Sequence, residues 1–276
     1  MREGRLSVVI TGASTGVGRA TAIALARGGA EVVLACRSVE RGEVVRREIE
    51  AQGGRAEVIE LELASLASVR RAADVLCERE IDVLINNAGV GGARGLTADG
   101  FELAFGTNAL GHHLFTRLLL PRLSPSARVV HLGSVSYARA GDRIDLARLE
   151  GSTRSLTGIH EYAVSKLAVM LLHHELARRL ALSRSMVMSV VADPGDVASD
   201  AYRHVPWPAR VLLTRRMKSC DQGAETPVFC ATSPEVENGG CYVGRARFTP
   251  TRAAMHDDEA RALWERCARW VGLDPD

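Results

Sequence analysis

The sequence has no long apolar run, no closely paired cysteines and no excess of charge of either sign. A membrane-spanning helix needs roughly 18–20 apolar residues in a row, and no run approaches that length, so we expect no membrane span. The six cysteines include no C-x-x-C pair, which is typical of reduced thiols in a cytoplasmic protein and not of a disulfide framework. Lysine and arginine number 35 against 33 aspartate and glutamate residues, so nothing marks a nucleic-acid partner.

A metal centre and a secretory leader are not expected either. The histidine doublets at 112–113 and 173–174 lack the spacing of metal ligands, and structural or surface roles suit them better. The N-terminal residues enter a strand pattern too early for a signal peptide. The sequence therefore predicts a cytoplasmic protein without bound metal.

What the sequence does have is a regular alternation of strand-like and helical segments through all 276 residues. This alternation predicts an α/β protein with a doubly wound parallel sheet, a Rossmann fold, with helices on both faces. No linker interrupts it, so we expect a single domain over residues 1–276. Two stretches depart from the pattern, about 138–158 and 196–219, and both are expected to build the substrate pocket. The second, which contains Pro206-Trp207-Pro208, is interpreted as a mobile lid.

The expected elements follow from apolar periodicity. Strands are expected at residues 7–10, 31–37, 56–63, 82–89, 128–134, 186–193 and 241–248. Helices are expected at residues 19–28, 41–52, 66–78, 101–119, 160–182, 222–232 and 257–271.

A glycine-rich turn, TGASTGVG at residues 11–18, joins the first strand to the first helix. Gly12 lets the chain turn sharply, Gly16 lets the backbone approach a pyrophosphate, and Gly18 lets helix pack on strand. Phosphates are then favoured at the helix N-terminus, where unpaired N–H groups point outward. Strand, glycine turn and helix in this order predict dinucleotide binding, although the spacing departs from G-x-G-x-x-G. The alternative is a turn that is merely rich in glycine.

The end of the second strand indicates which dinucleotide is bound. A carboxylate about 20 residues beyond the glycines would bind the ribose 2′-OH of NAD, but no acidic residue occurs here before Glu40. Arg37 instead offers a planar donor fork that suits a 2′-phosphate, and Ser14 can add a hydroxyl. We therefore expect NADP(H); the alternative is a solvated arginine.

Tyr162 and Lys166 stand four residues apart in a segment that is expected to be helical. This spacing puts both side chains on one face, about 5–6 Å apart at their Cβ atoms. Tyrosine titrates near ~10, so acid–base chemistry at neutral pH requires a shift of roughly 3 units, about 4 kcal/mol. A lysine cation ~5.5 Å away at an effective dielectric of ~20 supplies about 3 kcal/mol of it. The pair predicts a catalytic tyrosine; the alternative is a surface pair on an amphipathic helix.

Asparagines mark two further positions. Asn86-Asn87-Ala88-Gly89 breaks a buried strand as if to admit a flat ligand, although an Asx turn would explain the same residues. Asn108 lies on a largely apolar helix face, where an amide is costly unless it is hydrogen-bonded. We therefore expect Asn108 either to hydrogen-bond backbone groups and hold them in place or to take part in catalysis.

Together these residues resemble the short-chain dehydrogenase/reductase family. The shared motifs are Thr11-Gly12-x-x-x-Gly16-x-Gly18, Asn86-Asn87-Ala88-Gly89, Asn108, Ser134, Tyr162-x-x-x-Lys166 and Pro194-Gly195. The segments 35–37, 66–70 and 173–180 look most like the retinol-dehydrogenase-like branch, whose members usually prefer NADP(H).

The resemblance implies a role for each matching residue. Tyr162 would be the general acid/base, and Lys166 would hold the nicotinamide ribose while lowering the tyrosine pKa. Ser134 would hydrogen-bond the substrate oxygen, with Ser136 as a rival, and Asn108 would anchor a water in the proton relay. The implied cofactor-binding residues are Gly12, Ser14, Thr15, Gly16, Val17, Gly18, Arg37, Glu62, Leu63, Asn87, Ala88, Gly89, Tyr162, Lys166, Pro194, Gly195 and Val197.

Three residues depart from the family pattern. Glu62 would cap the adenine amine where the family usually has aspartate, and Asp193 is an unusual residue before Pro194-Gly195 that can alter the nicotinamide pocket. Ser199 replaces the commoner threonine near the carboxamide. None of these departures removes a catalytic residue.

The function implied is hydride transfer between NADP(H) and an alcohol or carbonyl of a hydrophobic small molecule. A homodimer or homotetramer built through helices 101–119 and 160–182 is also implied. The alternative is a cofactor-binding sensor or assembly subunit that has this fold but no turnover.

Overall fold

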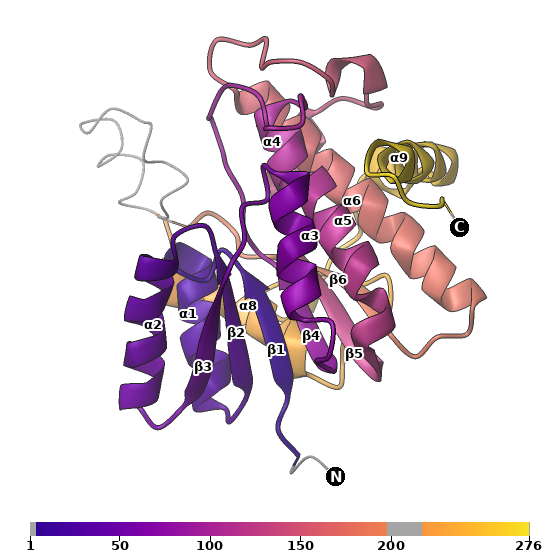
Figure 1. The fold of residues 1–276 in the computed structure, drawn as a ribbon. Coiled ribbons are helices and arrows are strands. Elements are labelled where there is room, and N and C mark those ends of the chain that lie inside the picture. The colour runs from indigo at the N-terminus through magenta and orange to yellow at the C-terminus, as the bar shows by residue number, and fades with distance from the viewer. Residues whose placement is uncertain (1–3, 198–216, 276) are drawn as a thin grey trace.

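The computed structural model describes residues 4–197 and 217–275, which form an eight-stranded sheet of order β3-β2-β1-β4-β5-β6-β7-β8 (Figure 1). Every neighbouring pair of strands is parallel except β7 and β8. The strands are β1 (Ser7–Thr11), β2 (Glu31–Cys36), β3 (Arg55–Glu60), β4 (Ile81–Asn86), β5 (Leu123–Leu132), β6 (Met188–Asp193), β7 (Cys241–Val243) and β8 (Ala246–Arg247). The doubly wound α/β sheet predicted from the sequence is confirmed.

Helices cover both faces of this sheet (Figure 1). They are α1 (Gly16–Arg27), α2 (Val39–Ala51), α3 (Leu66–Val75), α4 (Leu103–Phe105), α5 (Gly111–Leu119), α6 (Ile159–Leu182), α8 (Cys220–Thr232) and α9 (Asp257–Trp270). Because both faces are buried, neighbouring residues of one strand enter different cores. Val9 belongs to the core under α3, α5, α6 and α9, whereas Val8 and Ile10 belong to the core under α1, α2 and α8.

The order of the strands places a switch point between β1 and β4, where the chain turns to opposite sides of the sheet. Open α/β sheets bind ligands at the carboxyl ends of the strands beside such a point. The glycine turn follows β1, and Asn87 follows β4, so the two motifs meet at that edge.

Several predicted boundaries were wrong. The final strand, expected over residues 241–248, is a hairpin in which Tyr242 pairs with Arg247. Gly244, with φ +60°, turns the chain there, because glycine carries no Cβ penalty at positive φ. β3 ends at Glu60, so Glu62 and Leu63 lie in the loop beyond the strand.

The helix expected over residues 101–119 is interrupted by a π-helical turn, Gly106–Leu110, between α4 and α5. The turn lies close to its neighbours: a Cβ at Gly106 would clash with the Thr97 side chain, and one at Gly111 with the Leu63 backbone. Single π turns are frequent at functional sites, and this one carries Asn108.

Helix α9 lies beside α6 (Figure 1). The two helices share a core of buried aromatic and apolar side chains. Trp264 is buried, and the guanidinium carbons of Arg117 and Arg179 each lie 5.0 Å from its ring centroid. Trp270 lies 5.3 Å from the ring of Phe101 and 5.8 Å from that of Phe105. The C-terminal helix of the same chain therefore covers apolar surface of α4 and α6.

The two stretches expected to build the substrate pocket differ in what the structure describes. Residues 138–158 form turns and a short 3-10 helix, Leu146–Arg148, and Thr153 donates a hydrogen bond to the buried Glu102 carboxylate at 2.6 Å. The lid interpreted at 196–219 falls largely on residues 198–216, which lie outside the described residues. At its borders Val197 forms a parallel bridge with Lys218.

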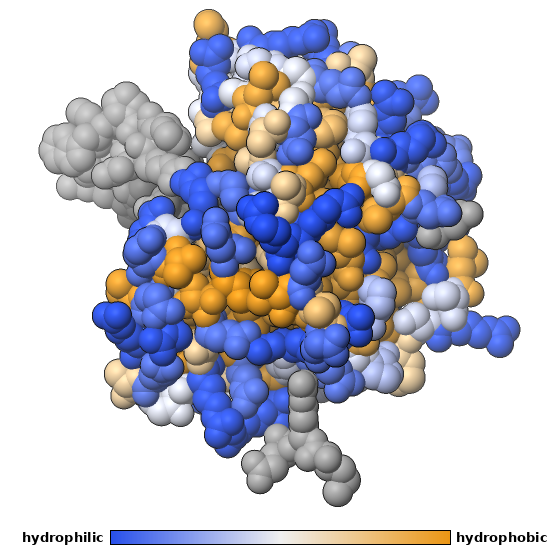
Figure 2. All heavy atoms as spheres, viewed as in Figure 1, coloured by the Kyte–Doolittle hydropathy of each residue, from blue (hydrophilic) through white to orange (hydrophobic). Residues whose placement is uncertain are grey.

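Hydrophilic residues cover much of the face shown in Figure 2, and apolar residues reach the surface in patches between them. Within residues 4–197 and 217–275, no helix is both long enough and apolar enough to cross a membrane. The same residues hold no group of three or more histidine, cysteine or acidic side chains placed to bind a metal ion.

Candidate active site

The glycine turn packs tightly against the residues that follow β4. Gly12 and Gly16 have φ of +67° and +57°, a region that disfavours residues with a Cβ. A Cβ at Gly12 would lie 2.8 Å from the Ala88 Cβ, and one at Gly18 would overlap the Asn87 amide. Gly18 therefore makes room for Asn87 as well as for the packing of α1 on the sheet.

Helix α1 begins at Gly16 with Thr15 as its N-cap residue, three residues earlier than the sequence pattern predicted. The first N–H groups of a helix have no partner within it, and they favour an anion. Val17 is buried, and a Cβ at Gly223 would touch both Val17 and Val197. The side chains of Val17 and Val197 thus pack close to Gly223 of α8.

Asn87 and Thr11 join the turn to the break after β4. The Asn87 amide donates to the carbonyl oxygen of Thr11 at 2.8 Å. In return the Thr11 hydroxyl oxygen accepts hydrogen bonds from the backbone N–H groups of Asn87 and Ala88, each at 3.0 Å. The break is therefore an ordered turn held by side chains of β1 and β4.

Asn108 ties down backbone, one of the two roles expected for it. Its Oδ1 accepts from the Val90 N–H at 2.8 Å, and its Nδ2 donates to the Val90 carbonyl at 3.0 Å. The same Nδ2 donates to the Ser165 hydroxyl at 2.9 Å, on the helix that carries Tyr162. Asn108 thus joins the loop after β4 to α6.

Lys166 lies beside Tyr162 on α6, as the spacing predicted. Its Nζ is 5.8 Å from the Tyr162 ring centroid and donates to the Leu132 carbonyl at 2.8 Å. Burial lowers the Lys166 pKa to about 8, and the Asp193 carboxylate opposes this shift. The side chain is therefore mostly a cation at pH 7, with little of its charge exposed to water.

Gly89 lies where the predicted catalytic residues converge. A Cβ added at Gly89 would be 3.3 Å from Asn108 Oδ1 and 4.0 Å from Lys166 Nζ. One added at Gly91 would be 3.6 Å from the Tyr162 ring. The backbone from Gly89 to Gly91 therefore passes between Asn108 and the Tyr162–Lys166 pair.

Ser134 caps a 3-10 helix, Val135–Arg139, that packs on α6. Its hydroxyl accepts from the Ser136 N–H at 3.3 Å and donates to the Ser136 hydroxyl at 3.0 Å. Ser134 and Ser136, the two alternatives for the contact to the substrate oxygen, are thus hydrogen-bonded to each other.

At the other end of the site, Arg37 lies beside Glu62. Arg37 Nε is 3.5 Å from a Glu62 carboxylate oxygen, and 59% of the Arg37 side chain is exposed. The other Glu62 oxygen accepts from the Ala64 N–H at 3.1 Å. Ser14 hydrogen-bonds the buried Cys36 thiol, so the predicted 2′-phosphate residues lie at the ends of β1 and β2. Leu63 is buried, and its carbonyl oxygen faces Gly111 of α5.

Asp193 ends β6, and Pro194 and Gly195 follow it at the same edge of the sheet. The buried Asp193 carboxylate accepts from the Gly195 N–H at 2.8 Å, and Gly195 has φ +75°. The departure from the family pattern thus serves to close this turn and places a negative charge near Lys166.

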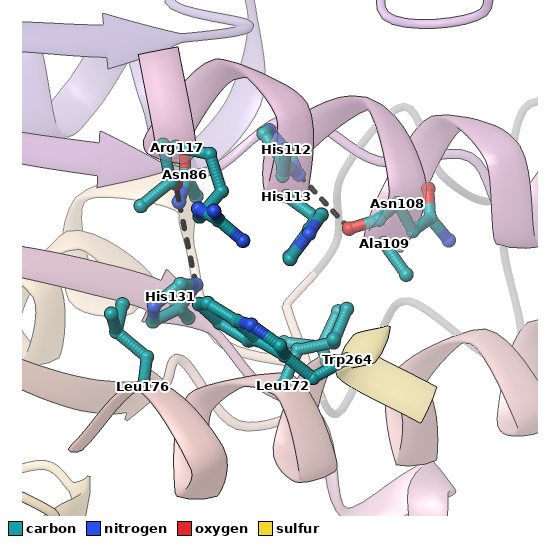
Figure 3. A pocket seen from close by; sticks show the side chains of 12 residues that line it. Asn86, Asn108, Ala109, His112, His113, Arg117, His131, Leu172, Leu176 and Trp264 are labelled. Carbon is teal, nitrogen blue, oxygen red and sulfur yellow. Dashed lines mark hydrogen bonds between the residues drawn. The ribbon is translucent and has the colours of Figure 1, made fainter. Parts of the chain in front are cut away.

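Sequence reasoning missed His112, whose ring bonds two parts of the site. Its Nδ1 lies 2.9 Å from the Asn108 carbonyl (Figure 3). Its Nε2 lies 2.8 Å from the Thr11 hydroxyl. The available signal was its position four residues after Asn108, which puts both on one helix face. His113, His131 and His173 are also buried, and His174 binds Asp257 at the surface, so the doublets, His112 apart, have the structural or surface roles expected of them.

These imidazoles line or adjoin a cavity of about 20 Å³ between the sheet, α5 and α6 (Figure 3). Asn86 donates to the Thr116 hydroxyl at 2.8 Å and approaches His131 Nδ1 at 3.3 Å. Trp264 of α9 closes the cavity from the outside, with His113 at its edge. The cavity thus brings buried amide and imidazole groups together with apolar side chains of α6 and α9.

Comparison with known proteins agrees with this geometry. Residues 7–206 match the short chain dehydrogenase family. Dehydrogenase/reductase SDR family member 13 of Bos taurus is 40% identical over 98% of this chain and 74% of that protein. Retinol dehydrogenase 11 of Homo sapiens is 39% identical over 98% of this chain and 86% of that protein.

A solved structure adds a bound cofactor to the comparison. A short-chain dehydrogenase from Burkholderia cenocepacia J2315, in complex with NADP, is 26% identical, with a TM-score of 0.70 over 86% of this chain and 95% of that one. Fold, motifs and relatives agree, so the chain belongs to the short-chain dehydrogenase/reductase family of oxidoreductases and is similar to its retinol dehydrogenases.

Proposed function

We propose that this protein is an NADP(H)-dependent oxidoreductase that moves a hydride between the nicotinamide and an alcohol or carbonyl of a hydrophobic small molecule. The observation that carries the proposal is the placement of Tyr162 and buried Lys166 beside Gly89 and Asn108, at the carboxyl edge of the sheet. The glycine turn meets the same edge. Acid–base groups and a dinucleotide cradle thus share one site.

The residues present fit the cofactor. The glycine turn and the N-terminus of α1 suit the pyrophosphate, because Gly12 and Gly18 allow close backbone approach and the helix offers unpaired N–H groups. Glu62 and Leu63 would face the adenine, and Arg37, 3.5 Å from Glu62, suits a 2′-phosphate. The NADP bound by the Burkholderia relative supports the same preference.

When bound, the nicotinamide supplies or accepts the hydride. Tyr162 exchanges the proton with the substrate oxygen, and Ser134, with Ser136 at its side, hydrogen-bonds that oxygen. Lys166 holds the nicotinamide ribose, and its cation favours the phenolate of Tyr162. Asn108 keeps the Gly89–Gly91 backbone in place.

A hydrophobic substrate is supported by the side chains next to these residues. Val135 directly follows Ser134, and Leu156 and Ile159 precede Tyr162; all three are apolar and more than half exposed, at 61%, 88% and 57%. Exposed apolar groups beside catalytic residues suit an apolar ligand. The name of the human relative, a retinol dehydrogenase, points the same way.

The test is NADPH consumption with a panel of apolar aldehydes and ketones, followed by identification of the alcohol formed. Turnover with at least one compound is expected. Tight NADPH binding without turnover on any compound would favour the alternative, a sensor or assembly subunit with this fold. No NADPH or NADH binding would contradict both.

Arg37→Asp is expected to reverse the cofactor preference, because a carboxylate replaces the cation that faces the 2′-phosphate and adds to the charge of Glu62. A charge-assisted hydrogen bond is worth about 1.5–3 kcal/mol, or roughly 10- to 150-fold in the ratio of kcat/KM for NADPH over NADH. Arg55→Asp is the control, since Arg55 pairs with Glu31 at the amino ends of β3 and β2, whereas Arg37 follows the carboxyl end of β2. A ratio unmoved by Arg37→Asp would place the phosphate elsewhere.

The homodimer or homotetramer stays a prediction. The family resemblance implied it, and α6 also has apolar residues around much of its circumference, part of which α9 of the same chain covers. An oligomer built through α5 and α6 therefore has to include α9 in its interface or displace it. Light scattering at micromolar protein is expected to give the mass of a dimer or tetramer, and a monomeric mass would refute the prediction.

A further inference from the structure

The Thr11 hydroxyl has a fully assigned set of hydrogen bonds. Its oxygen accepts from two backbone N–H groups, those of Asn87 and Ala88. A hydroxyl oxygen has two lone pairs and one proton, so both lone pairs are used. The Thr11 proton is therefore left to donate, and His112 Nε2 at 2.8 Å is the nearest acceptor, closer than the Ile85 carbonyl at 3.5 Å.

This assignment determines the state of the His112 ring. The Asn108 carbonyl can only accept, so His112 Nδ1 carries the proton and donates to it at 2.9 Å. Nε2 is then the unprotonated nitrogen that accepts from Thr11. A protonated ring would point an N–H at a hydroxyl whose lone pairs are both occupied, and burial lowers the His112 pKa to about 4, so the ring is neutral.

Residues 87–90, which follow β4, are consequently held at both ends by side chains of one helical stretch, residues 106–119. At the first end, His112 orients the Thr11 hydroxyl that receives the N–H groups of Asn87 and Ala88. At the other end, Asn108 accepts from and donates to Val90. The π turn between α4 and α5 carries Asn108, and His112 lies in α5, four residues after Asn108.

We propose that His112 is a positioning residue, whose neutral ring orients the Thr11 hydroxyl and thereby holds residues 87–90 in the shape that receives the nicotinamide half of the cofactor. The inference rests on the proposed function for its last step only. Its first step, the fixed conformation of residues 87–90, is a property of the protein without cofactor. A role of His112 in packing alone would require only its volume and not its Nε2.

Two substitutions separate these possibilities. A glutamine amide reaches as far as imidazole Nε2, so His112→Gln keeps an oxygen that can accept from Thr11. An asparagine amide reaches only Nδ1, so His112→Asn keeps the donor to Asn108 but leaves the Thr11 proton only the Ile85 carbonyl, 3.5 Å away. His113→Asn is the matched control, because His113 is equally buried on the same helix and faces Trp264.

The first measurement is hydrogen exchange of peptides covering residues 86–92 in the protein without cofactor. An unpaired buried group costs about 1–3 kcal/mol, roughly 5- to 150-fold in an equilibrium. Exchange in this segment is therefore expected to be on the order of 10-fold faster in His112→Asn, and near the wild-type rate in His112→Gln and His113→Asn. Equal rates in the His112 variants would overturn the proposal.

The second measurement is the NADPH dissociation constant, expected to rise on the order of 10-fold in His112→Asn and to stay within about 3-fold of wild type in His112→Gln. Equal dissociation constants in these variants would overturn the cofactor step. If the wild type bound no NADPH, the proposed function would fail, and the exchange rates would still decide the positioning role. Should His112→Asn not fold, His112→Leu takes its place, because leucine fills the site without a group that can accept from Thr11 and leaves the Thr11 hydroxyl itself intact; it must then show the fast exchange.

Discussion

Tyr162→Phe is expected to lower turnover by about 100- to 10,000-fold, the usual contribution of a positioned acid or base. The change removes a single hydroxyl. It keeps the ring that lies 5.8 Å from Lys166 Nζ and against Gly91, so NADPH affinity should stay near the wild-type value. Rates measured with saturating NADPH and the best substrate of the panel test this directly.

Tyr242→Phe is the control for Tyr162→Phe. Tyr242 is buried on β7, and its hydroxyl accepts from the Glu237 N–H at 3.0 Å. Its loss should lower the free energy of unfolding by about 1 kcal/mol and leave turnover within a few-fold of wild type. A Tyr162→Phe enzyme that kept a tenth or more of wild-type turnover would show that another group is the proton donor.

The protein is expected to lose stability steeply as the pH falls below 6.5. Burial lowers the pKa of His112 to about 4 and those of His113 and His173 to about 3. A group whose folded pKa lies below its unfolded value near ~6.5 contributes stability that is complete above pH 6.5 and is lost as the pH falls toward the folded pKa. At pH 5 each of the three costs about 2 kcal/mol, together about 6 kcal/mol.

That loss is comparable to the whole stability of a typical domain, about 5–15 kcal/mol. Urea denaturation between pH 8 and pH 5 measures it as a falling free energy of unfolding. His113→Phe should lose less stability over the range, by about 2 kcal/mol, because one buried imidazole no longer has to be protonated. His160→Asn, on the exposed start of α6, is the matched control. A free energy of unfolding that stayed level from pH 7 to pH 5 would contradict the prediction.

The sequence was most informative where the relevant signal is local. Alternating strands and helices identified the doubly wound sheet, because apolar periodicity reflects which faces of each element are buried. The glycine turn and the Tyr162–Lys166 pair were found in the same way, since the periods of strand and helix fix which side chains share a face. Boundaries were less accurate, as the hairpin at Gly244 and the π turn at Asn108 show.

What only the tertiary structure decided are contacts between residues far apart in the chain. Thr11 and His112 are separated by 101 positions, and Asn108 and Ser165 by 57. No period of a strand or helix relates such pairs, because their distance depends on how whole elements pack.

The same packing buries Lys166 and the histidines and lays α9 over α6. Burial then sets which of these groups carry charge, since a low dielectric disfavours the ionised form. A residue type and its spacing name the chemistry that is possible, but charge state and orientation follow from what surrounds the residue in space.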